Sequence, residues 1–189
     1  FTSIYKMCLK GDDEPLLEIV IDGLWEQEDR SVISALVEVL RSDKGYIVRS
    51  AVASALGRFS VLAQENKLLV KDSEFVHDSL MQVLEDEEEP LDVRRRCMEA
   101  VAPFNTMEIN QRITLAYESL DPDFRASSIF AMGRTGEIGW LPILLQELEN
   151  DEPAIRYETA HACGELGEED AVPHLILLLE DDDSEVQLA

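Results

Sequence analysis

The chain has 189 residues, of which 46% are hydrophobic, and its 40 acidic residues against 16 basic ones give a net charge of −24. Because phosphate-rich and anionic surfaces are bound by clustered Lys and Arg, this balance argues against nucleic acid and membrane as partners. It leaves a protein partner, including a basic one, and it also keeps an exposed chain soluble.

The three cysteines, Cys8, Cys97 and Cys163, are odd in number, widely separated and without a CxxC pair. This usage favours a reducing compartment, and each cysteine falls on an apolar helical position where core packing is its expected role. The sequence shows no signal peptide and no apolar run of membrane-spanning length. We therefore expect a cytoplasmic protein.

The chain begins with an apolar stripe at helical spacing, formed by Phe1, Ile4, Tyr5, Cys8 and Leu9. No partner helix precedes this stripe, so residues 1–10 are predicted to be a partial unit. The next unit, at 14–41, pairs a helix at 16–26, in which Gly23 takes a small-residue position, with a second helix at 31–41.

From there the sequence repeats around an arginine that follows an apolar residue, at Arg49, Arg94, Arg125 and Arg156. The last three anchors are 31 residues apart, and such a period is the mark of a solenoid. The predicted units are residues 46–85, 91–120, 122–149 and 153–180. A partial unit at 184–189 suggests that the whole chain, 1–189, is one array cut from a longer solenoid.

Within each unit, the positions around the anchor predict two helices. An alanine stands six residues after each arginine, at Ala55, Ala100, Ala131 and Ala162, which suggests that first helices approach closely there. Gly57, Gly133 and Gly164 stand eight residues after their anchors and are read as helix C-caps, with Gly136 and Gly167 following in two units.

The second helices begin with proline in their first turn and are followed by acidic turns. Their apolar stripes are Leu141, Leu144, Leu145 and Leu148 in one unit and Val172, Leu175, Ile176 and Leu179 in the next. Between Phe59 and Asp72, about fourteen extra residues interrupt the period. They form either a binding loop or, as their leucines favour, an extended helix packing through Leu62, Leu68, Leu69 and Val70.

The pattern of apolar residue, Arg, five residues, Ala, apolar residue and Gly, followed by a turn and a Pro-containing helix, resembles the HEAT-like repeats of the phycobilisome-lyase type. The resemblance implies an all-α fold, an α-α superhelix of antiparallel helix pairs of the HEAT or armadillo kind. It also implies that the second helices line a concave face and that the recurring arginine bonds to acids or carbonyls of neighbouring units.

One enzyme of this repeat class, deoxyhypusine hydroxylase, carries Arg-His-Glu at the anchor, and its His and Glu ligate two irons. Of the His and Glu positions that would ligate iron, only Glu158 is matched here, and no histidine stands at the four sites. The motifs of zincins, α/β-hydrolases and phosphate-binding loops are absent as well. We therefore expect no catalytic residue, no metal and no cofactor.

These observations favour a non-enzymatic scaffold or adaptor that binds a protein through its concave face. Six residues in 31-residue columns of the second helices are the predicted contact surface: Arg112, Ile143 and His174, and one turn on Leu115, Gln146 and Leu177. The alternative is an enzyme or enzyme subunit of the bilin-lyase type, whose array holds a substrate protein. The sequence leaves the oligomeric state open.

Overall fold

A computed structural model describes residues 2–24 and 29–189, and every element in these residues is helical. The chain divides into two compact units, residues 1–104 and 105–189. Phe1 of the predicted first stripe and the end of the predicted helix at 16–26 lie outside the described residues. The all-α prediction is confirmed, and the helices are arranged as in HEAT and armadillo-type repeats.

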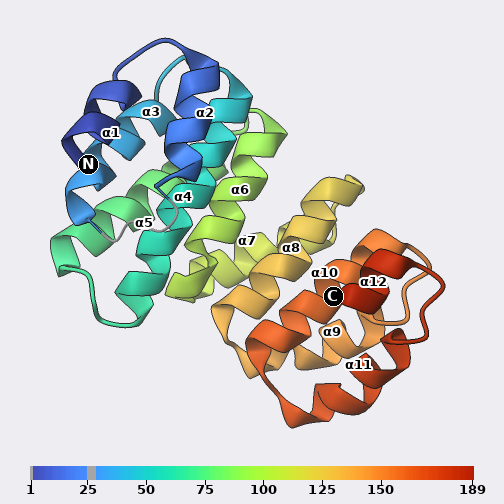
Figure 1. Ribbon diagram of the computed structural model, residues 1–189. Helices are drawn as coiled ribbons and strands as arrows, with labels where there is room; N and C mark the ends of the chain where they lie inside the picture. Colours follow the sequence, from blue (N-terminus) through green and yellow to red (C-terminus); the bar gives the residue numbers. More distant parts are fainter. Residues whose placement is uncertain (1, 25–28) are drawn as a thin grey trace. The chain divides into compact units, whose positions relative to one another are not determined.

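Unit 1 is built on the long helix α4, which packs against α2, α3, α5 and α6 (Figure 1). Its buried face includes Val52, Leu56 and Phe59. The elements are α1 (Thr2–Leu9), α2 (Glu14–Asp22), η1 (Arg30–Val32), α3 (Ile33–Leu40), α4 (Tyr46–Gln64), α5 (Val70–Glu85), α6 (Leu91–Val101) and η2 (Ala102–Phe104).

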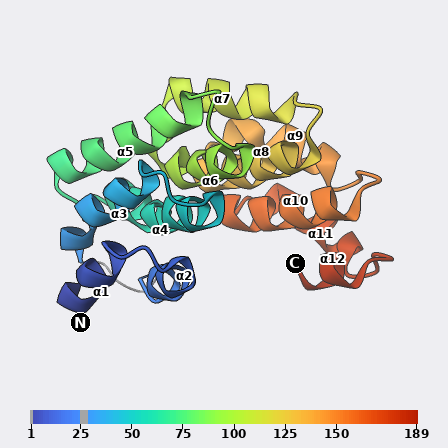
Figure 2. The same cartoon turned by 90° about the horizontal axis from the view of Figure 1, so that it is seen from above.

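Unit 2 shows the 31-residue period directly. Its elements are α7 (Met107–Tyr117), α8 (Pro122–Thr135), η3 (Ile138–Trp140), α9 (Leu141–Glu147), α10 (Pro153–Leu166), η4 (Glu169–Ala171), α11 (Val172–Leu178) and α12 (Ser184–Leu188). Helices α8 and α10 pack on each other, α7 packs on α8, and α9 packs on α10 (Figures 1 and 2). First and second helices therefore form two layers within this unit.

The turns that lead into the first helices share one hydrogen bond. In each, a side-chain oxygen accepts the backbone N–H of the residue two positions on, and the accepting residues are Ser42, Asp86, Ser119, Asn150 and Asp181. Asp121 and Asp183 then cap α8 and α12 by accepting N–H groups of the first turn. Part of the acidity of the turns is therefore structural.

The glycines eight residues after the anchors are not C-caps, and that prediction was wrong. Gly57, Gly133 and Gly164 lie inside α4, α8 and α10, whereas α8 and α10 end at Gly136 and Gly167, with φ of 66° and 72°. Only a left-handed φ requires glycine at a helix end. Gly57 and Gly133 instead allow close contact between helices, since each faces the alanine of the next first helix.

The extra residues after Phe59 extend helices, as their leucine content favoured. α4 continues to Gln64, and α5 begins at Val70 after a short turn that contains Asn66 with φ of 58°. The predicted packing holds for Leu62, which is buried, and fails for Leu69 and Val70, which are 47% and 73% exposed. The failure arises because these two residues lie at the turn, where no helix covers them.

The predicted stripe of α11 also differs from the structure. Leu141, Leu144 and Leu148 of α9 are buried, but their counterparts Val172 and Leu179 of α11 are 49% and 65% exposed. Helix α10 packs on α9, whereas no comparable helix packs on this side of α11 among the described residues. Both α9 and α11 therefore carry the apolar stripe, but only the stripe of α9 is covered by another helix.

Cys97 and Cys163 are buried and Cys8 is half-buried, and all three thiols are free. Burial raises the pKa of Cys163 to about 11 and raises that of Cys97 further above its ordinary value. The two buried thiols are therefore unreactive near neutral pH, as expected of cysteines that pack in a core.

One described helix, α4, has the length and apolar composition to cross a membrane, with a mean hydropathy of 1.2. More than half of that stretch is buried inside unit 1, and the core helix of a soluble protein has the same composition. The burial of Val48, Leu56 and Phe59 supports the packed interpretation.

Candidate functional site

The anchor arginines join the ends of second helices. Arg49 Nε donates to the carbonyl of Leu40 at 2.8 Å, and Arg94 Nε donates to the carbonyl of Leu84 at 3.1 Å. Arg49 also binds Glu89, which follows the second helix of its own pair. A planar guanidinium with several donors suits such a role, because it satisfies carbonyls that a helix end leaves unpaired. These arginines act as structural clasps, as the resemblance implied.

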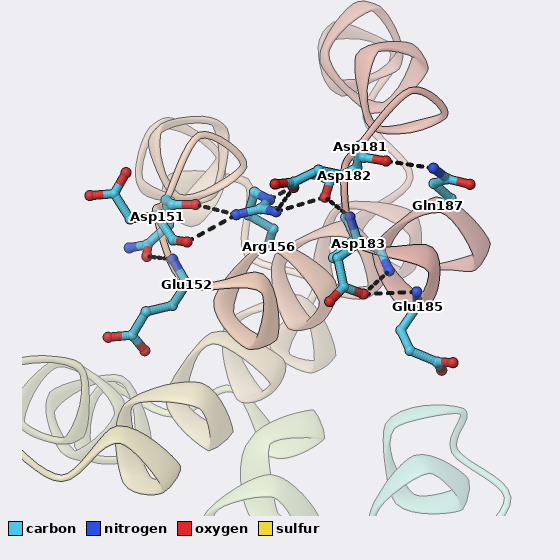
Figure 3. A network of polar contacts seen from close by, with 10 residues as sticks. Asp151, Glu152, Arg156, Asp181, Asp182, Asp183, Glu185 and Gln187 are labelled. Atoms are coloured by element: carbon cyan, nitrogen blue, oxygen red, sulfur yellow. Dashed lines mark hydrogen bonds and ion pairs between the residues drawn. The ribbon is translucent and has the colours of Figure 1, made fainter.

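Arg156 makes the most extensive of these clasps (Figure 3). Its guanidinium binds Asp181 through two bonds of 2.6 and 2.7 Å, reaches Asp182 at 3.0 Å, and donates to the carbonyls of Asn150 and Asp151. The hydrogen bonds from Arg156 and from the Asp183 backbone lower the pKa of Asp181 to about 2. Much of the acidic run at 180–183 is thus bound by groups of the protein itself.

Because Asp181 is bound to Arg156, we expect the protein to lose stability in acid. Because the pKa of Asp181 is about 2 in the folded state, below the ordinary 3.8, the carboxylate stabilises the fold above pH 4, and this contribution is lost as pH falls from about 4 to 2. We expect Asp181→Asn to lower stability at pH 7 and to flatten the dependence across this window. Urea unfolding at each pH measures both effects.

Asp182→Asn is the matched control for that experiment, because the side chain of Asp182 is 94% exposed although it touches the same arginine. The control is expected to retain the acid-dependent loss of stability. An equally steep loss in Asp181→Asn would contradict the assignment of this titration to Asp181.

Arg125 makes a different clasp, around the buried carboxylate of Glu147. Its guanidinium donates to both carboxylate oxygens at 3.0 Å and lies 5.3 Å from the ring centroid of Tyr117. The Tyr117 hydroxyl and the Asn150 amide donate to the same carboxylate. Burial and the Glu147 carboxylate raise the pKa of Tyr117, so this hydroxyl keeps its proton and remains a donor. The cluster connects α7, α8 and α9.

The six residues of the predicted contact surface lie on the second helices α7, α9 and α11 of unit 2. Leu115 and Leu177 are 61% and 69% exposed. Gln146 is exposed, whereas Arg112, Ile143 and His174 are half-buried, and Arg112 also interacts with another residue. At the position shared by Leu115, Gln146 and Leu177, two of the three second helices therefore expose an apolar side chain.

A second exposed column was missed by the sequence interpretation. Glu118, Glu149 and Glu180 lie three residues after the Leu115, Gln146 and Leu177 positions, where α7, α9 and α11 end, and all three are exposed. None has an ion pair or a side-chain hydrogen bond within residues 2–24 and 29–189. The identical 31-residue spacing of the three glutamates was the available signal.

The position of these glutamates is electrostatically unfavourable. A helix C-terminus carries partial negative charge, so a carboxylate there is repelled by unpaired carbonyl groups and a cation is attracted. The three acids therefore do not stabilise the helices that they follow. We name the columns Leu115, Gln146 and Leu177 and Glu118, Glu149 and Glu180 together the second-helix surface.

Unit 2 has few cations to balance its acids. Residues 105–189 contain 19 acidic residues, four arginines and no lysine. Arg125, Arg134 and Arg156 are bound to carboxylates within the unit. The second-helix surface is therefore acidic, and its three glutamates have no paired cation among the described residues. The described residues contain no group of three or more His, Cys, Asp or Glu side chains placed to hold a metal ion.

Residues 109–189 match the family model of HEAT repeats, so this part of the chain consists of HEAT-like repeats. The phycobilisome-lyase subtype stays a prediction. No curated protein matches the sequence.

Solved structures show the same fold at low sequence identity. The X-ray structure of YibA from Escherichia coli is 20% identical, with a TM-score of 0.59 over 99% of this chain and 71% of that one. An engineered protein is 17% identical, with a TM-score of 0.51 over 97% of this chain and 91% of that one. Human deoxyhypusine hydroxylase in complex with glycerol is 18% identical, with a TM-score of 0.47 over 97% and 80%.

Proposed function

We propose that this HEAT-like repeat chain is a non-enzymatic protein-interaction scaffold whose second-helix surface binds a partner segment rich in lysine or arginine. The observation that carries the proposal is the column of Glu118, Glu149 and Glu180, three exposed carboxylates without a cation among the described residues. HEAT-like repeats commonly serve as scaffolds for protein partners.

Two physical arguments support a basic partner. The glutamates stand at the negative ends of helices, so a partner's cation relieves repulsion that the folded chain itself leaves in place. The exposed Leu115 and Leu177 lie one turn from these glutamates and offer contact to the apolar stem of a lysine or to an adjacent leucine. A segment with both cationic and apolar side chains fits both columns.

The repeat also sets the spacing that a probe needs. Packed helices lie 8–10 Å apart, and an extended chain advances about 3.3 Å per residue. A partner crossing the second helices in extended form therefore meets one glutamate about every three residues. A fluorescent peptide of four Lys-Leu-Ser repeats has this spacing and serves as the probe.

The test is to reverse the acidic column with Glu118→Lys, Glu149→Lys and Glu180→Lys together. We expect the affinity for the probe, measured by fluorescence anisotropy at low salt, to fall about tenfold or more, because opposite charges are replaced by like ones. The affinity for the unmodified chain is also expected to fall with salt, since exposed pairs are screened.

The matched control is the triple change Glu18→Lys, Glu38→Lys and Glu74→Lys, which alters net charge equally at exposed acids of unit 1. It is expected to bind the probe with an affinity near that of the unmodified chain. Equal weakening by both triple variants would show that the peptide responds to overall charge alone, and the proposed surface would then be wrong.

The proposal includes a cytoplasmic location, which is supported by three cysteines that remain unbridged. Cell fractionation followed by detection of the chain tests this point. Recovery of the protein with disulfide-bonded secreted proteins would contradict it.

A further inference from the structure

The turn between α4 and α5 differs in charge from the rest of the chain. From Tyr46 to Lys71 there are four basic residues and one acidic residue, Glu65, although acids outnumber basic residues by more than two to one in the whole chain. Two of the five lysines, Lys67 and Lys71, lie in this turn and at the start of α5. The extra residues that interrupt the repeat therefore form a basic segment at one edge of unit 1 (Figure 1).

The two lysines flank apolar side chains that face solvent. Leu69 and Val70 are 47% and 73% exposed, although surface turns are ordinarily polar. Within residues 2–24 and 29–189, Lys71 has no ion pair or side-chain hydrogen bond, and Lys67 pairs only with the exposed Glu65. Exposed pairs of this kind are weak, so both ammonium groups can bind carboxylates of another molecule. We name Lys67, Leu69, Val70 and Lys71 the lysine turn.

The lysine turn has the features that the second-helix surface requires of a partner. That surface presents one glutamate on each of three consecutive second helices, with Leu115 and Leu177 one turn away. Packed helices lie about 8–10 Å apart. The chain from Lys67 to Lys71 is first extended and then helical, so it spans about 10 Å. Both lysines can therefore meet glutamates of consecutive helices while the apolar residues between them contact an exposed leucine.

We propose that the lysine turn of one copy of the chain binds the second-helix surface of a second copy, with each lysine paired to one of the three glutamates. This inference rests on the proposed function, because it names the basic segment that occupies that surface. The two contacting surfaces differ and lie in different units, so each bound copy still has one free turn or one free surface. The product is a head-to-tail assembly that grows with concentration.

Net charge opposes this contact at long range, and local charge favours it. Each copy carries a net charge of −24, so two copies repel each other at low salt. At physiological ionic strength the repulsion is screened beyond about 8 Å, whereas paired ammonium and carboxylate groups lie closer than that. The association is therefore weak, with a dissociation constant on the order of 0.1 mM.

The test is sedimentation velocity of charge-reversed variants at physiological salt. The unmodified chain is expected to sediment faster as its concentration rises through the dissociation constant. Lys67→Glu with Lys71→Glu should weaken this association about tenfold or more. The triple change Glu118→Lys, Glu149→Lys and Glu180→Lys should do the same, although it lowers the general repulsion between copies. A chain with all five changes should associate again, because both surfaces have exchanged their signs.

Lys10→Glu with Arg41→Glu is the matched control, since both side chains are exposed, lie in unit 1 outside the lysine turn and change the net charge equally. This control is expected to retain association. A chain that stays monomeric, association that survives the Lys67 and Lys71 changes, or five changes that do not restore it would each overturn the inference. The Lys-Leu-Ser probe separates the two failures, because its binding to the acidic column would leave the proposed function standing.

Discussion

Replacing Arg125 by leucine is expected to lower the free energy of unfolding by about 2–3 kcal/mol, because the change leaves the carboxylate of Glu147 buried without its cation. Glu147 is only 3% exposed and sits where α7 and α11 carry Ala116 and Leu178. The side chain of Arg125 is itself 32% exposed, so the expected effect is smaller than that of breaking a fully buried pair. Urea or thermal unfolding measures it.

Arg134→Leu is the matched control, since Arg134 lies on the same helix and pairs with Glu165 at 3.4 Å, but that glutamate side chain is 52% exposed. We expect this exposed pair to contribute less than about 1 kcal/mol. The double variant Arg125→Leu with Glu147→Leu should be more stable than Arg125→Leu alone, because it removes the unpaired charge. Equal losses from the two arginine variants would contradict this account of the cluster.

Gly133→Ala is expected to destabilise unit 2 by about 1–3 kcal/mol, because its methyl group would overlap the backbone of Ala162. The added carbon would lie 2.5 Å from Cα and 2.7 Å from the carbonyl oxygen of Ala162. Backbone atoms cannot rotate away as a flexible side chain can, so α8 and α10 have to move apart. Thermal unfolding followed by circular dichroism detects the change.

Gly164→Ala is the matched control, because it makes the same substitution at the same register position of α10, where a Cβ atom meets nothing within 4 Å. Alanine is the better helix former by about 1 kcal/mol, so this variant is expected to be more stable than the unmodified chain. The opposite signs of the stability changes expected for the two substitutions test the glycine–alanine contact. A stabilising Gly133→Ala would show that the two helices do not meet as closely as described.

The repeat was readable from the sequence because its constant residues are each required by local physics. The apolar residue before Arg94 or Arg156 faces the core, and Ala131 and Ala162 lie where first helices pack. The assignment of Gly133 and Gly164 as helix ends failed because glycine serves two purposes. A left-handed φ and a close backbone approach both favour it, and only Gly136 and Gly167 have the positive φ.

The site was less predictable than the fold. The period of the sequence placed Leu115 and Leu177 on second helices. It could not show whether their side chains are exposed. Glu147 looked like one more acid in an acidic chain, and its burial among Arg125, Tyr117 and Asn150 depends on three separate segments. Pairing between distant residues is not encoded in local periodicity.

The sequence by itself determined the helical class, the 31-residue period, the anchor arginines and the acidic character, because these follow from spacing and composition. The tertiary structure decided which acids are bound and which are unpaired. It placed Asp181 and Glu147 in clasps while leaving Glu118, Glu149 and Glu180 exposed. It also separated Gly133, covered by Ala162, from Gly164, which is open. The reason is that the position of a residue along a helix sets its direction, whereas its partner depends on what packs against that face.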